Sequence, residues 1–93
     1  MEEFILEKVA TLSHLEGKIN ISQVPLHLLP DIGQIVDIIL GNLVVQATFI
    51  NAGSFRINNV LIGNWLQQNN IGVGNTFYIR IINNNTFEFL TNA

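Results

Sequence analysis

VLIGNWLQQNNIGVGNTFYIRI, residues 60–81, joins a short helical pattern to a glycine-containing turn and a strand pattern. Its first apolar side chains recur at helical spacing, with the amides of residues 67–69 on the opposite face. The apolar stripe consists of Leu61, Ile62, Trp65 and Leu66. Asn58 or Asn59 can cap such a helix, and Asn70 can end it in a left-handed conformation. We therefore predict a short amphipathic helix whose tryptophan packs in the core.

The last hairpin begins where Gly72 and Gly74 turn the chain into a strand predicted from Thr76 to Ile82. A three-residue loop at 83–85 places charged residues opposite each other, whereas a two-residue loop would set arginine against phenylalanine. The predicted pairs are Arg80 with Glu88, Ile81 with Phe87, and Ile79 with Phe89. Asparagine tolerates left-handed backbone angles, so the Asn triplet can close this loop without glycine.

The most apolar segment, residues 35–50, reads as a second hairpin rather than a membrane span. It is shorter than the ~20 residues that a membrane-spanning helix needs, and polar residues interrupt it. A two-residue turn at Gly41-Asn42 gives one wholly apolar face. The predicted pairs are Leu40 with Leu43, Ile38 with Val45 and Val36 with Ala47 on that face, and Asp37 with Gln46 on the other.

Composition limits the chain to a single domain over residues 1–93. Hydrophobic residues make up 48% and charged residues 12%, so we expect the chain to fold. There is no cysteine, which excludes disulfides and thiolate metal sites. Two histidines alone match no recognised metal spacing, and we expect neither a metal nor a cofactor. The acidic start MEEFILEK is unlike a cationic signal peptide and predicts a cytoplasmic protein.

The two halves of the chain repeat one order of elements: strand, short helix, glycine-containing turn and hairpin. In the first half the helical turn is predicted over residues 22–29, with Ser22 as cap and Pro25 in its first turn. Two such units are too few for a solenoid and instead suggest a closed, symmetric arrangement. We predict a mostly β, seven-stranded open pseudobarrel with two short helices and two pseudo-repeated β-α-β-β halves.

Several ordered motifs then resemble one family of DNA-binding domains. FILEKVATLSH (4–14) is similar to its opening strand and following loop, and GKINISQ (17–23) to its second strand. Trp65-Leu66, Asn70-Ile71, Gly74 and the stretch TFEF (86–89) follow in the family's order. Together they resemble the B-three pseudobarrel of plant auxin- and abscisic-acid-response factors. The same fold forms the effector domains of EcoRII-type and BfiI-type restriction endonucleases.

The resemblance implies that two arms grip the major groove of double-stranded DNA. The first arm would be residues 11–18 with the start of the second strand, and the other would be the connection 51–59. By position, the contacts implied are Ser13, His14, Lys18, Asn20, Ser22 and Gln23 on the first arm, and Asn51, Ser54, Arg56, Asn58 and Asn59 on the second. Arginine can read guanine, and asparagine and glutamine can read adenine. For Arg56 an ion pair or a snorkelling strand position is the alternative interpretation.

Three features depart from the family pattern. Asn75 replaces an aspartate after the turn glycine, and Ser22-Gln23 replace a proline and a basic residue. The net charge is −3, and the chain has four basic residues, Lys8, Lys18, Arg56 and Arg80, whereas nucleic-acid-binding domains commonly carry a basic patch.

Catalysis finds little support in the residue inventory. Ser13 and His14 with Asp31 or Asp37 lack a nucleophile elbow, and GVGN is too short for a phosphate loop. We expect no enzymatic activity from this chain alone, although it fits the recognition domain of a nuclease or of a bacterial or phage regulator. The alternative is a protein-interaction barrel, an AbrB-like or other cradle-loop regulator, that pairs with a second copy through its apolar strand edges or with other domains of a parent protein.

Overall fold

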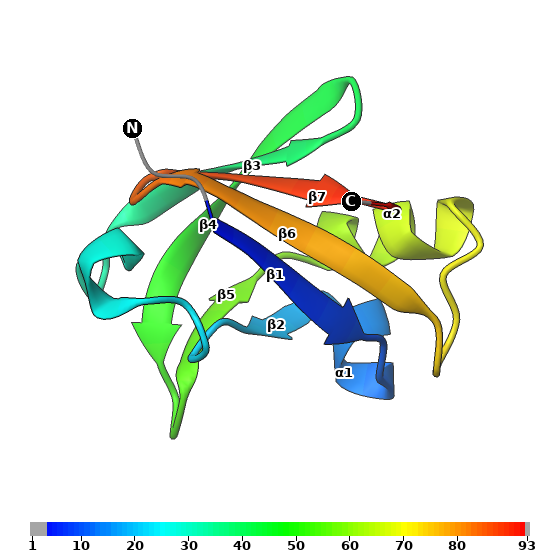
Figure 1. The fold of residues 1–93 in the computed structure, drawn as a ribbon, viewed down its shortest axis with the longest axis horizontal. Coiled ribbons are helices and arrows are strands. Elements are labelled where there is room, and N and C mark those ends of the chain that lie inside the picture. The colour runs from blue at the N-terminus through cyan, green and yellow to red at the C-terminus, as the bar shows by residue number, and fades with distance from the viewer. Residues whose placement is uncertain (1–3, 93) are drawn as a thin grey trace.

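Seven strands form one curled, open sheet in the computed structural model, which describes residues 4–92 (Figure 1). The strands are β1 (Phe4–Val9), β2 (Lys18–Asn20), β3 (Ile35–Leu40), β4 (Leu43–Asn51), β5 (Phe55–Asn58), β6 (Thr76–Asn83) and β7 (Thr86–Leu90). The remaining elements are the helices α1 (Leu12–Leu15) and α2 (Val60–Gln68) and a 3₁₀ turn, η1 (Leu26–Leu28). The predicted mostly β, seven-stranded open barrel with two short helices is confirmed.

The strand order is β1-β6-β7-β3-β4-β5-β2, and neighbouring strands run antiparallel except β3 and β7, which run parallel. Strands β1 and β2 are the two edges, so the sheet curls without closing. After β1 the order β2, η1, β3, β4 is repeated as β5, α2, β6, β7. The parallel pair joins the hairpin of one repeat to the hairpin of the other.

The β3–β4 hairpin has the predicted register. Leu40 lies opposite Leu43, Ile38 opposite Val45, Val36 opposite Ala47, and Asp37 opposite Gln46. Gly41 takes a φ of 64°, which suits the first position of a type II′ turn. Within residues 4–92 no helix combines the length and the apolar character that crossing a membrane requires.

The β6–β7 hairpin keeps the predicted pairs but closes differently. Arg80 lies opposite Glu88, Ile81 opposite Phe87, and Ile79 opposite Phe89. However, Asn83 pairs with Thr86, and a register shift lies between Ile81 and Asn83. The predicted three-residue loop is therefore wrong, because an irregularity at residue 82 supplies the extra residue and only residues 84 and 85 form the turn. Neither of these two asparagines has a positive φ.

The core lies on the inner side of the curled sheet, where alternate strand residues point. Four phenylalanines are at most 1% exposed, and the rings of Phe77 and Phe89 stack with centroids 6.0 Å apart. The four are Phe49, Phe77, Phe87 and Phe89. Helix α2 adds Ile62 and Leu66, both at 0% exposure, to this core.

Helix α2 confirms the predicted caps and corrects the predicted apolar stripe. Asn59 is the N-cap, and Asn70 has a φ of 61° just after the helix. Leu61 is 41% exposed, and Trp65 is half-buried with its ring edge-to-face against Phe89, 6.3 Å between centroids. Trp65 therefore packs at the margin of the core and not inside it.

The helical turn predicted over residues 22–29 is shorter than expected. It is reduced to η1, with Pro25 before its first residue and no side chain capping it. The predicted Ser22 cap is wrong, because the Ser22 hydroxyl instead accepts a hydrogen bond from the backbone N–H of Phe55 at 3.3 Å.

Candidate nucleic-acid interface

Strands β2 and β5 bring residues of both predicted arms onto one surface. They pair antiparallel at the edge of the sheet, with Ile19 and Ile57 opposite each other and fully buried. The residues on either side of these two isoleucines therefore face outward. Lys18 lies opposite Asn58, and Asn20 lies opposite Arg56. These four residues, Lys18, Asn20, Arg56 and Asn58, are called the ribbon face below.

Local hydrogen bonds orient two side chains of the ribbon face. The Nε–H of Arg56 donates to the Oγ of Ser54 at 3.0 Å. This bond leaves the two terminal nitrogens of the guanidinium, which form one of its donor forks, for a ligand. The Oδ1 of Asn20 accepts the backbone N–H of Ser22 at 2.8 Å, which leaves the amide NH₂ as its outward donor.

A cavity of about 220 Å³ lies beside the ribbon face. Its lining is polar or charged and consists of Thr11, Ser13, His14, Lys18, Asn20 and Arg56. Two of the four basic residues in the sequence border it. The cavity therefore joins the start of the first predicted arm to the β2–β5 pair.

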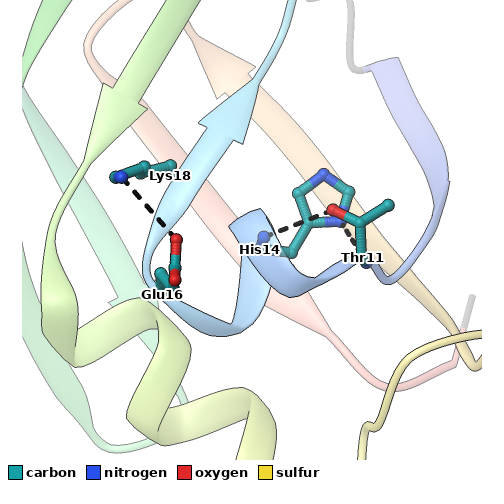
Figure 2. Close-up of polar contacts among 4 residues, drawn as sticks. All are labelled: Thr11, His14, Glu16 and Lys18. Atoms are coloured by element: carbon teal, nitrogen blue, oxygen red, sulfur yellow. Dashed lines mark hydrogen bonds and ion pairs between the residues drawn. The ribbon is translucent and has the colours of Figure 1, made fainter.

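The segment after β1, predicted as a loop, contains the single-turn helix α1. The Thr11 hydroxyl accepts the backbone N–H of His14 at 3.4 Å, and the backbone N–H of Thr11 donates to His14 Nδ1 at 3.1 Å (Figure 2). This reciprocal arrangement is a capping box in which histidine takes the usual place of glutamate or glutamine. Thr11 was absent from the predicted contacts. The sequence signal for its capping role is a threonine three residues before a side chain with an acceptor atom.

His14 serves the fold through its ring. It is 7% exposed and packs edge-on against Phe77, with 5.4 Å between ring centroids. Burial lowers the pKa of His14, and the nearby Lys8 charge lowers it further, while a hydrogen bond with the Val9 backbone acts in the opposite direction. Burial also lowers the pKa of Lys8. The ring nitrogen that accepts from Thr11 must be unprotonated, which fits a neutral His14.

Asn59 is also committed to the fold. Its Oδ1 accepts the N–H of Leu61 at 2.8 Å, and its Nδ2 donates to the carbonyl of Gln46 at 2.8 Å. Its backbone N–H donates to the carbonyl of Gly17 at 2.9 Å, which links the two predicted arms. Since both ends of the Asn59 amide are used internally, we leave Asn59 and His14 out of the proposed contact set.

The other predicted contacts surround the ribbon face. Ser13 borders the cavity from α1, whereas Ser22 and Gln23 are exposed just after β2. Asn51 lies opposite Phe55 where β4 ends, and Ser54 precedes β5 in the connection between these strands. The structure thus gathers the two arms into a single ribbon and its margins.

Charge on the ribbon face is only weakly compensated. Lys18 Nζ lies 3.6 Å from Glu16 Oε1, and both side chains are more than half exposed, at 54% and 62% (Figure 2). Such an exposed pair is worth little and yields readily to a competing anion. Arg56 forms no ion pair with the described residues 4–92. Within that same part of the chain, no group of three or more His, Cys, Asp or Glu side chains could hold a metal ion.

Comparison of the chain with protein families, with curated proteins and with solved structures found no match.

Proposed function

We propose that this domain binds double-stranded DNA, with the β2–β5 ribbon placed in the major groove. The major groove accepts a two-stranded β-ribbon as well as a helix. The observation that carries the proposal is the ribbon face itself, where Lys18, Asn20, Arg56 and Asn58 form two directly opposed pairs from distant segments of the chain.

The chemistry of the ribbon face suits base reading with modest phosphate contact. The terminal nitrogens of Arg56 can donate together to guanine O6 and N7, and Asn20 and Asn58 can reach adenine or a phosphate. Lys18 and Ser13 supply donors for phosphate oxygens. Only two basic side chains, Lys18 and Arg56, lie on the ribbon face, so few phosphates can be contacted. Selectivity would therefore come from the edges of the DNA bases more than from the phosphate backbone.

The small number of basic residues limits how strongly DNA affinity can depend on salt concentration. Each neutralised phosphate contributes about −0.9 to the slope of log affinity against log salt, so Lys18 and Arg56 together give about −1.8 per chain. All four basic residues of the sequence would give at most about −3.6. A much steeper slope would place the contact on residues outside the ribbon face.

The experiment is a selection of bound duplexes from a random pool, followed by titration of the selected duplex at several salt concentrations. The double variant Lys18→Ala, Arg56→Ala should lose enrichment, whereas Arg80→Ala, a loss of charge outside both predicted arms, should keep it. Wild-type protein that enriches no sequence would overturn the proposal and favour a protein-interaction barrel without DNA readout.

A further inference from the structure

The outer face of the sheet carries apolar side chains that the core does not use. On β1, β6, β7, β3 and β4 the residues next to buried ones point away from the core. Figure 1 shows β1, β6 and β7 side by side. On this face Ile5 is 48% exposed, Ile35 58% and Val44 60%. Exposed apolar side chains gathered on one sheet face are a common mark of an interaction site.

One row of this outer face can be followed across five strands. Ile5 lies opposite Arg80, Arg80 opposite Glu88, Glu88 beside Ile39, and Ile39 opposite Val44. We call these five residues the outer row. At its centre Arg80 Nη2 lies 2.5 Å from Glu88 Oε1, with side chains 38% and 23% exposed. The outer row thus has an ion pair in the middle and apolar residues on each side.

This order is complementary to itself. Consider a two-fold axis that runs parallel to the strands, midway between β6 and β7, with a second copy stacked on the outer face. The axis places Arg80 of one copy over Glu88 of the other, and Ile5 over Ile39. The neighbouring pair, Tyr78 opposite Leu90, is likewise exchanged into an apolar contact. Among these six residues, charge therefore meets opposite charge and apolar meets apolar in both copies at once.

We infer that the outer face is the site at which two copies of this chain associate. Two-fold interfaces use the same patch on both subunits, and Ile5, Arg80, Glu88 and Ile39 of the outer row meet that requirement without any change of side chain. Charge complementarity at its centre fixes the register, while the flanking apolar residues supply the buried area. This inference does not depend on DNA binding, because the outer row and the ribbon face share no residue.

Because the sheets twist, contacts close to the two-fold axis are the best positions at which to test the dimer by mutation. Stacked sheets lie about 30° apart because each one twists, so side chains far from the axis are displaced most. Arg80 and Glu88 flank the axis and keep their exchange. A charge reversal at either position should therefore separate the copies, since it puts like charges face to face.

The test is sedimentation equilibrium of purified chain from dilute to about 500 μM, where a dimer with a micromolar dissociation constant is well populated. Wild type should rise from the mass of one chain towards two. Arg80→Glu alone and Glu88→Arg alone should each raise the dissociation constant about tenfold or more. An equimolar mixture of the two variants should regain the dimer, because both glutamates of the first variant then face arginines of the second. That rescue cannot arise from the ion pair within one chain.

Matched variants keep the inference falsifiable. Arg56→Glu makes the same charge change on the ribbon face and should dimerise with the same dissociation constant as wild type. If either reversal variant fails to fold, as judged by circular dichroism, Ile5→Lys replaces it, because this residue is already half exposed and should weaken only the dimer. A wild-type chain that stays monomeric, or a mixture that fails to regain the dimer, would overturn the inference.

Discussion

Arg56 and Arg80 lie on outward faces of antiparallel strand pairs, yet their surroundings differ. Arg80 faces Glu88 across β6–β7 and pairs with it. Arg56 faces Asn20 across β2–β5, and its Nε–H donates to the Ser54 hydroxyl. The charge of Arg80 is balanced by the carboxylate of Glu88. Arg56 is instead oriented by a neutral hydroxyl, which does not compensate its charge.

This difference distinguishes an arginine that is paired within the sheet from one that we propose as a ligand contact. A cross-strand ion pair stabilises the sheet and sets its register. A guanidinium that is held by a hydroxyl keeps its charge and its terminal donors for a ligand. This contrast supports our proposals that the β2–β5 end contacts an anionic or hydrogen-bonding partner and that the β6–β7 face contacts a second copy of the chain.

The largest effect is expected from a substitution at Gly17, which lies just before β2 and packs against the backbone at the start of α2. This position is not part of the outer face. Gly17 has a φ of 87°, and a Cβ there would lie 2.1 Å from the carbonyl oxygen of Asn59. Gly17→Ala should lower the free energy of unfolding by about 3–5 kcal/mol, because backbone strain and overpacking act together. Urea denaturation measures the loss.

Gly33→Ala is the matched control for this substitution. Gly33 has nearly the same φ, 88°, but a Cβ there would meet nothing within 4 Å. Its cost should therefore be about 1–2 kcal/mol, from the left-handed conformation alone. Equal losses in the two variants would contradict the close contact between the end of α1 and the start of α2.

The next expected effect distinguishes the two arginines by stability. Arg80→Ala should cost about 1 kcal/mol, because it leaves the half-buried Glu88 without its cross-strand partner. Arg56→Ala should change stability by less than about 0.5 kcal/mol, as an outward substitution with one hydrogen bond to a hydroxyl. Thermal unfolding of dilute protein measures both, and a larger loss for Arg56→Ala would reverse the two assigned roles.

The pH dependence of stability tests the capping box. Because the folded state lowers the pKa of His14 below its ordinary 6.5, the neutral form is favoured on folding. The stability from neutral His14 is present above pH 6.5 and is lost as the pH falls through the lowered folded value. His14→Gln keeps an acceptor at the capping position and should flatten the stability profile below pH 6.5 relative to wild type. Parallel profiles would mean that His14 does not carry this linkage.

Hairpin registers were predictable because their signals are local. A strand has a period of two, so a shift by one residue would have turned apolar side chains to solvent in either hairpin. Asp37 opposite Gln46 and Arg80 opposite Glu88 followed from this rule. Asn70 was likewise predictable as a left-handed residue after a helix.

The errors arose where several local solutions satisfy the same pattern. Three asparagines can form a three-residue loop, but an irregularity at residue 82 absorbs the register shift and leaves a two-residue turn. Trp65 has helical spacing with core residues, but spacing does not say how far a side chain reaches, and it lies at the margin. The parallel contact between β3 and β7 joins segments far apart in sequence, and no local signal specifies it.

The sequence predicted which polar residues lie near the β2–β5 pair, but it did not predict which of their polar atoms are already used in hydrogen bonds within the fold. Lys18, Arg56 and the asparagines opposite them lie on one face, as the two predicted arms required. His14 and Asn59 were in the same predicted set, yet their polar atoms complete the caps of α1 and α2. Only the three-dimensional arrangement separates a side chain that faces solvent from one that closes a helix.

The most direct measurement compares Arg56→Ala, Arg56→Lys and wild type on the selected duplex and on random DNA. Lysine keeps the charge but lacks the planar fork, so Arg56→Lys should retain most affinity for random DNA and lose discrimination worth about 1–3 kcal/mol. Arg56→Ala should lose both. If all three proteins bind the two DNA samples with the same affinities, the ribbon face is not a DNA-reading surface.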